Sequence, residues 1–180
     1  MKVLLDTCVL YPVLLREILM LAAENTLFEP LWSPRIFEEW VRRAAKDGPV
    51  EEMTVRGDQT LLNARYPRAL VIVPPALQAR LWLPDPDDIH VLAAAIAGHA
   101  DLILTFNAQD FPRGTLREEG LERQNPDEFL LQIWLDQPAA FARVSTALSA
   151  RLPANIDLRQ ALKRAGLPRL GKAISLSSAG

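Results

Sequence analysis

Asp6 is the only charged residue in the stretch "VLLDTCVLY", which covers residues 3 to 11. A carboxylate that leaves water for an apolar setting needs a hydrogen-bonding partner, a proton or a metal ion. Asp6 could instead cap the turn that follows it, because aspartate often does so after a strand. Since its neighbours are apolar, we favour a role in a functional site over a role in capping.

Glu38 and Glu39 form a second acidic group, within "SPRIFEEW". On a helix, Glu39 would lie beside the apolar Ile36–Trp40 stripe, whereas Glu38 would point further round. The alternative is a solvated face on which the two glutamates pair with Arg42 and Arg43, four residues along. That alternative suits Glu38 better, so Glu39 is the candidate metal ligand and Glu38 the less certain one.

A third acidic group opens the stretch "LPDPDDIHVLAAA". Asp85 before Pro86 is typical of a helix cap, and Asp87 and Asp88 would fall in the first turn, where the helix dipole favours anions. Capping does not require three carboxylates within four residues, and these repel one another unless a cation intervenes. Asp88 is the best ligand candidate because it lies nearest the apolar face, and Asp85 and Asp87 are less certain. We expect His90 to be a packed or surface histidine rather than a catalyst.

The fourth group follows an apolar run in "LTFNAQDFP", which contributes Thr105, Asn107 and Asp110. A turn closed by asparagine and aspartate is common, so this group alone identifies no site. Together, however, the four groups offer a set of oxygen ligands, which suits Mg²⁺ or Mn²⁺ rather than zinc. A metal ion held by carboxylates can activate water and stabilise the charge of a phosphodiester during in-line displacement.

The elements that must position these residues alternate between strands and helices. This order predicts an α/β sandwich around a mostly parallel sheet. In such sheets, ligands gather outside the carboxyl ends of the strands at a topological switch point. Asp6 and the Thr105–Asn107 segment both follow strands, so we expect them to be neighbours. We expect strands at residues 2–5, 31–33, 69–75 and 101–106, and helices over 13–27, 34–46, 51–65, 85–100 and 125–152.

Cysteine and histidine are too few for several other kinds of site. Cys8 is the single cysteine, which excludes an internal disulfide and a cysteine-ligated zinc site. With only His90 and His99, a histidine-rich metal site is also excluded. Carboxylates are therefore the remaining candidates for metal ligands.

Length and charge fit one ordinary domain with a short appendage. The chain has 180 residues, 49% of them apolar, and a net charge of −2. No apolar run is long enough to cross a bilayer, and Asp6 interrupts the N-terminal apolar run too early for a signal peptide. We therefore expect a soluble, cytoplasmic protein with no membrane partner. Sixteen of the 20 basic residues are arginine, which fits either nucleic-acid contact or a compositional bias of the source genome.

The order of these motifs resembles that of the PIN-domain ribonucleases, which include the VapC toxins of bacterial toxin–antitoxin pairs. The resemblance covers residues 3 to 112, and its most specific part joins "DPDDIHVLAAA" to "ADLILTFNAQDFP". It implies a three-layer α/β/α domain and Mg²⁺- or Mn²⁺-dependent cleavage of RNA that leaves a 5′-phosphate and a 3′-hydroxyl. The family's first three acids map onto Asp6, Glu39 and Asp88. The fourth position is open, because this chain has Asn107 where family members often carry aspartate, and Asp110 is the alternative.

The resemblance also bears on the flanking residues. Thr7 and Thr105 resemble the small hydroxyl residues that support the metal ligands. We expect a PIN-like nuclease domain over residues 1–135 and a helical C-terminal extension over 136–180, like that of the longer family members. We expect the last residues of this extension to be flexible. A VapC-type toxin would be neutralised by a cognate antitoxin, and dimers are usual in the family. Candidate contacts to RNA or to a protein partner, which could equally be a solvated face, are Arg43, Arg159, Lys163, Arg164 and Arg169.

Two rival functions keep the same fold. One is a non-catalytic interaction module, which Asn107 keeps open because it removes one acid. The other is a phosphatase or a nuclease acting on DNA. Cys8 stands where a haloacid-dehalogenase-type phosphatase needs a second aspartate, and the chain has little length for the helical clamps of a flap nuclease.

Overall fold

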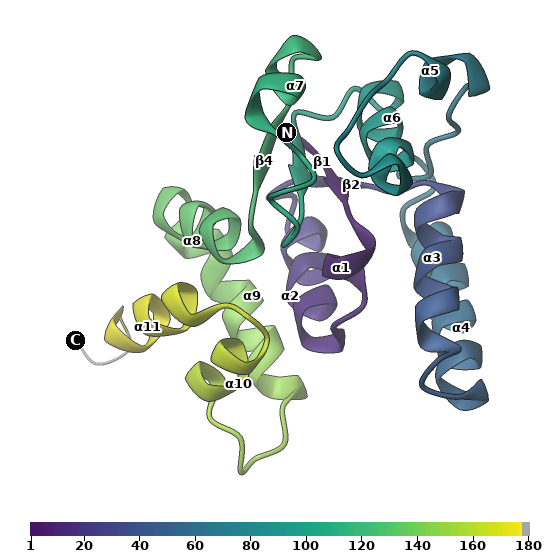
Figure 1. Ribbon diagram of the computed structural model, residues 1–180. Coiled ribbons are helices and arrows are strands. Elements are labelled where there is room, and N and C mark those ends of the chain that lie inside the picture. The colour runs from purple at the N-terminus through teal and green to yellow at the C-terminus, as the bar shows by residue number, and fades with distance from the viewer. Residues whose placement is uncertain (178–180) are drawn as a thin grey trace.

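Four short strands form a parallel sheet in the computed structural model, which describes residues 1–177 (Figure 1). The strands lie in the order β2-β1-β3-β4, and each neighbouring pair is parallel. The predicted α/β architecture with a parallel sheet is therefore confirmed. The strand bounds are β1 (Lys2–Leu5), β2 (Glu29–Leu31), β3 (Leu102–Leu104) and β4 (Glu122–Gln124).

Helices cover the sheet and extend beyond it. Because crossovers between parallel strands are right-handed, α2 covers one face of the sheet while α6 and α7 cover the other (Figure 1). No helix in residues 1–177 combines the length and the apolar character needed to cross a membrane. The helices are α1 (Thr7–Leu10), α2 (Val13–Glu24), α3 (Pro34–Ala44), α4 (Pro49–Arg65), α5 (Pro75–Ala79), the 3₁₀ turn η1 (Pro86–Asp88), α6 (Ile89–Ala97), α7 (Arg113–Glu118), α8 (Pro126–Asp136), α9 (Pro138–Arg151), α10 (Leu158–Arg164) and α11 (Pro168–Ser177).

The start of α3 follows its predicted cap. The Ser33 hydroxyl accepts a hydrogen bond from the Ile36 backbone N–H at 3.3 Å, and Pro34 occupies the first helical position. A cap of this kind stabilises a helix by about 1 kcal/mol. The buried face of α3 includes Phe37 and Trp40, which anchors the helix and fixes the direction in which Glu39 points.

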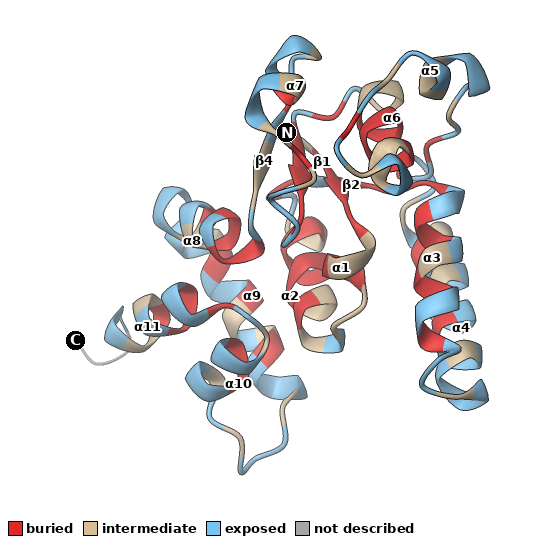
Figure 2. Cartoon of the chain, viewed as in Figure 1, coloured by how far each residue is buried: buried red, intermediate tan, exposed pale blue. Residues whose placement is uncertain are grey.

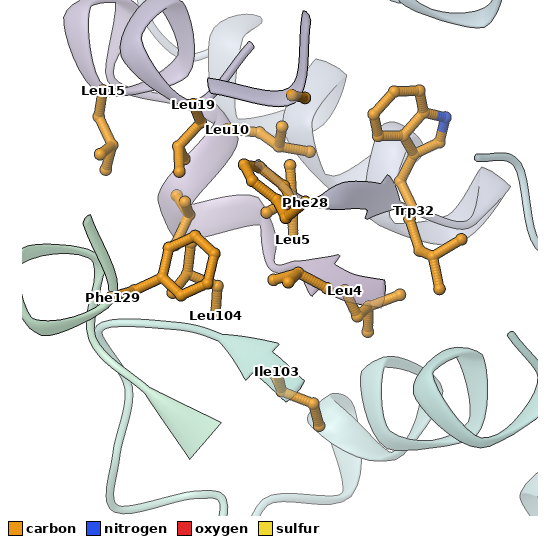
Figure 3. Close-up of a cluster of buried hydrophobic side chains, with 14 of the residues drawn as sticks. Leu4, Leu5, Leu10, Leu15, Leu19, Phe28, Trp32, Ile103, Leu104 and Phe129 are labelled. Atoms are coloured by element: carbon orange, nitrogen blue, oxygen red, sulfur yellow. The ribbon is translucent and has the colours of Figure 1, made fainter. Parts of the chain in front are cut away.

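The core lies on both faces of the sheet. Strands β1 and β3 are buried along their apolar residues, whereas the outer sides of α4, α7 and α10 are exposed (Figure 2). Side chains from β1, β3, α2 and α8 meet in one cluster, which includes Leu5, Leu19, Leu104 and Phe129 (Figure 3). The ends of β1 and β3 are therefore held in fixed positions, which the site requires.

The C-terminal helices pack onto the sheet-covering helices. α9 and α10 contact α2, and α11 contacts α8 and α10. The predicted boundary near residue 135 falls close to Gln137, where α8 gives way to α9, but the division into two domains stays a prediction. α11 continues through the serine-rich end to Ser177, and the predicted flexibility of the last residues concerns positions 178–180, which lie outside the described residues.

Two predicted elements differ from the structure, and strand β4 is an element that the sequence did not predict. Residues 69–75 form no strand, because β2 ends at Leu31 and leaves only Trp32 to pair with Leu70. The helix predicted over 125–152 is two helices, since Pro138 forces Gln137 out of the helical conformation. Strand β4 was not predicted, because its residues are polar and carry no apolar alternation.

Candidate metal centre

The site lies where the strand order reverses. From β1 the chain passes to β2 on one side and returns, past β1, to β3 on the other, so the carboxyl ends of β1 and β3 form a switch point. Asp6 follows β1 and Thr105 follows β3 directly. The Thr105 hydroxyl donates a hydrogen bond of 2.6 Å to Asp6 Oδ2, which confirms that these two predicted positions are neighbours.

Asp6 does not act as a helix cap. It occupies the residue before α1, but its side chain makes no capping hydrogen bond. The residue is only 6% exposed, and its carboxylate accepts hydrogen bonds from Thr105 and, at 3.1 Å, from the Cys8 thiol. Burial, followed by the nearby charge of Asp6, raises the pKa of Cys8 to about 12, so this thiol stays protonated as a donor. The alternative of a simple capping role for Asp6 is therefore excluded.

Asp85, Asp88 and Asp110 form the acidic cluster, a group of carboxylates within residues 1–177 that could hold a metal ion. One oxygen from each carboxylate lies within 4.8 Å of the others. Asn107 links two of them, because its amide donates to Asp88 Oδ2 at 3.3 Å and also to Asp110 Oδ2. Asp85 caps η1 by accepting from the Asp87 N–H at 2.9 Å, whereas Asp88 makes no capping hydrogen bond to α6. Capping thus accounts for Asp85 but not for Asp88.

The pKa of Asp88 shows that the electrostatic potential of this region is strongly negative. Burial and then the charges of Asp6, Asp110, Asp85 and Glu39, in that order, raise the pKa of Asp88 from 3.8 to about 7. Five carboxylates from four segments of the chain therefore act on one place. A divalent cation would relieve this repulsion, and a donor set made of oxygens is the one that hard cations prefer.

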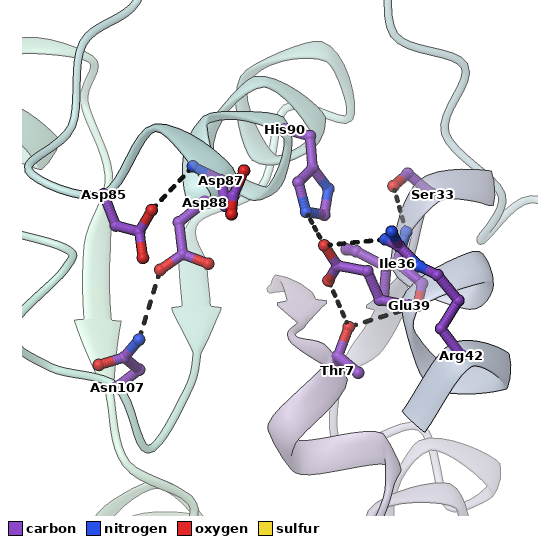
Figure 4. A network of polar contacts seen from close by, with 10 residues as sticks. All are labelled: Thr7, Ser33, Ile36, Glu39, Arg42, Asp85, Asp87, Asp88, His90 and Asn107. Carbon is purple, nitrogen blue, oxygen red and sulfur yellow. Dashed lines mark hydrogen bonds and ion pairs between the residues drawn. The ribbon is translucent and has the colours of Figure 1, made fainter. Parts of the chain in front are cut away.

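Glu39 is held by two hydrogen bonds and one ion pair on the opposite side of this region (Figure 4). Its Oε2 accepts from the Thr7 hydroxyl at 3.0 Å, and its Oε1 lies 2.8 Å from His90 Nε2 and 3.7 Å from Arg42. Burial opposes the charged form, but the hydrogen bonds from His90 and Thr7 and the charges of His90 and Arg42 lower the pKa of Glu39. Glu39 is therefore a fixed and ionised carboxylate.

Asp6 and Glu39 lie outside the acidic cluster but inside its electrostatic field. Their side-chain oxygens do not belong to the group within 4.8 Å, although both charges raise the pKa of Asp88. That Asp6, Glu39 and Asp88 share one ion with Asp110 or Asn107 stays a prediction. Of the less certain candidates, Thr7 contacts Glu39, Asp87 contributes its backbone N–H, and Glu38 is exposed on α3.

Sequence reasoning missed two contributors and misjudged the pairing of the two arginines on α3. His90 is buried and bonded to Glu39, while its Nδ1 has no hydrogen-bonding partner among the described residues. The Cys8 thiol was not foreseen as a donor to Asp6. Arg42 pairs with Glu39 three residues away, whereas Arg43 stacks on Tyr11 with its guanidinium carbon 4.2 Å from the ring centre. The only feature of the sequence that could have indicated a role for His90 in the site is its position two residues after Asp88.

The fold and the site together define a class of protein, parallel α/β domains in which carboxylates gather at the switch point and can hold a catalytic divalent ion. The family model described as PIN domain matches residues 2–109, and the chain belongs to that family. PIN domains are typically metal-dependent nucleases that bind divalent ions, and the acidic cluster supplies suitable ligands here. No curated protein and no solved structure is significantly similar to the chain.

The raised pKa of Asp88 predicts how stability depends on pH without metal. A carboxyl whose pKa is higher in the folded than in the unfolded state holds an extra proton between those two values, so stability falls as pH rises from about 4 to about 7. In a chelator, we expect the melting temperature to fall from about pH 4 to about pH 7, and to fall less in Asp88→Asn. The variant should also be the more stable protein at the higher pH. Identical pH profiles for the two proteins would contradict the electrostatic account of Asp88.

Proposed function

We propose that this protein is an endoribonuclease that uses Mg²⁺ or Mn²⁺ to hydrolyse RNA phosphodiester bonds, and that it is the toxin of a VapBC-type pair. The observation that supports this most directly is that the charges of Asp6, Glu39, Asp85 and Asp110 all act on Asp88 in a PIN domain. Hydrolysis by this chemistry leaves a 5′-phosphate and a 3′-hydroxyl.

In this proposal the residues divide into ligands and the groups that hold them. Asp6, Glu39 and Asp88 would hold the ion, with Asp110 or Asn107 completing the set. A bound divalent ion lowers the pKa of water and stabilises charge on the phosphate. Thr105 fixes Asp6, Asn107 fixes Asp88, and Thr7 with His90 fixes Glu39. Outer groups of this kind orient ligands and increase their affinity for metal.

Partners and location are part of the same proposal. A cognate antitoxin would block the acidic region, and the protein would act in the cytoplasm. It would form a homodimer, as members of the family usually do. Exposed arginine and lysine side chains on α10 and α11 support contact with RNA or with an acidic partner, since arginine binds phosphate and carboxylate in a bidentate way.

The second candidate function is a non-catalytic interaction module. Asn107 favours it, because an amide stands where many family members carry a fourth carboxylate, and the second cation site would then be weak. Calorimetric titration with Mn²⁺ separates the two candidates. An enzyme should take up Mn²⁺ in a manner that depends on Asp88, whereas a module with degraded chemistry should take up none.

Sequencing the ends of cleaved nucleic acid tests the proposal directly. We expect the purified protein to cut RNA in Mn²⁺, to leave 5′-phosphate ends, and to stop in excess chelator. DNA of the same base sequence should remain intact under the same conditions. Preferential cleavage of the DNA would replace the ribonuclease by the DNA-directed alternative, and cutting that persists in chelator would rule out a metal-dependent mechanism.

A further inference from the structure

One large aromatic side chain, Phe106, is exposed next to residues of the acidic region, and a second, Trp82, is exposed in the segment that leads to Asp85. Phe106 is 44% exposed and Trp82 is 67% exposed, and they are the aromatic members among the exposed large apolar side chains of residues 1–177. Trp82 precedes Asp85 by three residues, and Phe106 lies between Thr105 and Asn107. The remaining exposed apolar side chains of this size are not aromatic, so both exposed rings belong to segments that carry acidic residues of the site.

Phe106 is held in position by its backbone. Its N–H donates to Cys8 Sγ at 3.3 Å, and the residues on either side of it bind Asp6 and Asp88. The backbone that carries the ring is therefore fixed between a residue that binds Asp6 and a residue that binds Asp88. An exposed ring on a fixed backbone presents a flat apolar surface at little cost in conformational entropy.

The tip of the Phe106 ring rests on the C-terminal extension. A Cβ atom placed on Gly166 would lie 3.2 Å from Phe106 Cζ, and Gly166 has a φ of +82°, which a side chain would strain. Gly166 lies in the turn between α10 and α11, and its N–H donates to the Lys163 carbonyl. The extension thus reaches the edge of the site through this glycine.

The end of α10 brings positive charge to the same place. Lys163 and Arg164 are exposed in the last turn of the helix, and neither forms an ion pair within residues 1–177. A cluster of carboxylates repels the phosphates of a nucleic acid, and the chain as a whole carries a charge of −2. Cations at the border of the cluster are therefore needed to hold a polyanion against it.

We propose that Phe106, with Trp82 as a second platform, stacks on unpaired bases next to the cleaved phosphate, while Lys163 and Arg164 bind the neighbouring phosphates of a single-stranded RNA. This inference rests on the proposed ribonuclease function and adds to it a base-binding subsite at Phe106, beside the acidic cluster. Stacking on an aromatic ring is available to every base but requires that the base be unpaired, so a duplex is excluded. The C-terminal extension then has a role in binding substrate.

The test measures KM for a fluorogenic single-stranded RNA oligonucleotide in Mn²⁺. Phe106→Ala should raise KM about tenfold, since loss of stacking weakens binding by that order. Phe106→Leu keeps an apolar contact with Gly166 and should be as impaired as the alanine variant, whereas Phe106→Tyr should resemble the parent. Recovery in the leucine variant would show that the ring only packs against the extension and would overturn the inference.

Charge is tested with a matched pair of arginines. Arg164→Ala should raise KM and reduce the slope of log KM against log salt by about 0.7, the value for one phosphate contact on a single strand. Arg68→Ala is the control, because Arg68 lines a cavity of about 620 Å³ with Lys2 and Glu29, at the starts of β1 and β2 and away from the acidic cluster. Equal effects of the two substitutions would overturn the phosphate contact.

Two further measurements separate this inference from the proposed function. A parent protein that cleaves the single strand but not its annealed duplex supports both, and Mn²⁺ calorimetry should be unchanged in Phe106→Ala. A parent that cleaves RNA while Phe106→Ala keeps the parent KM, or that cuts the duplex equally well, overturns the stacking subsite alone. A parent that cleaves no RNA overturns the proposed function and this inference with it.

Discussion

Asp6→Asn is expected to reduce RNA cleavage by more than about a hundredfold while leaving the fold intact. Loss of a residue that merely supports a metal ligand costs ten- to a hundredfold, so loss of a ligand charge should cost more. The change removes one negative charge and keeps an oxygen that can still accept from Thr105 at the same place. Because Asp6 is buried and its charge acts on Asp88, the variant should be as stable as the parent or more stable. Initial cleavage rates in Mn²⁺ and melting temperatures in chelator measure the two effects.

Asp101→Asn is the matched control for this substitution. Asp101 precedes β3 at the opposite end of the sheet, is exposed, and accepts a hydrogen bond of 2.7 Å from the Lys2 N–H. Its loss should leave the cleavage rate within about twofold of the parent, as for most surface substitutions. A parental rate in Asp6→Asn would remove Asp6 from the metal site and would leave only the fold assignment.

Much of the fold was predictable because its two central strands are apolar and several helices have clear signals at their starts. The leucine-rich runs of β1 and β3 predicted buried strands, and Ser33 with Pro34 predicted the start of α3. What failed depends on pairing rather than on local pattern. β4 is polar and exists because it pairs with β3, while the β-branched residues 69–75 lack a partner beyond Trp32.

The site shows the same division. Carboxylates could be placed at the switch point because strand ends of a parallel sheet share one edge, and the contact between Asp6 and Thr105 follows from that rule alone. Contacts between side chains of separate helices could not be inferred in this way. The hydrogen bond between His90 and Glu39 joins α6 to α3, and the sequence of neither helix indicates that these two side chains meet. The rotation of one helix against its neighbour decides such pairs, and packing fixes that rotation.

The second large effect is expected at Glu39 and not at Glu38. Glu39→Gln should lower the cleavage rate by about a hundredfold and weaken Mn²⁺ binding, because it removes a charge that Thr7, His90 and Arg42 hold in place. Glutamine keeps one carbonyl oxygen as an acceptor, so part of this network survives and the protein should fold. Glu38→Gln removes the same charge from an exposed position on the same helix, and we expect less than a twofold change.

The comparison between these neighbours is sharp because helix α3 carries both. A change in overall charge, in helix propensity or in expression would affect the two variants alike, whereas a role in metal binding would affect only Glu39. Equal losses would mean that the negative charge of α3 acts at long range and that neither residue is a ligand. A loss confined to Glu38 would show that α3 turns its other face to the substrate. A loss confined to Glu39, with weaker Mn²⁺ uptake in calorimetry, would place α3 together with the β1 end and the η1–α6 junction in one metal site.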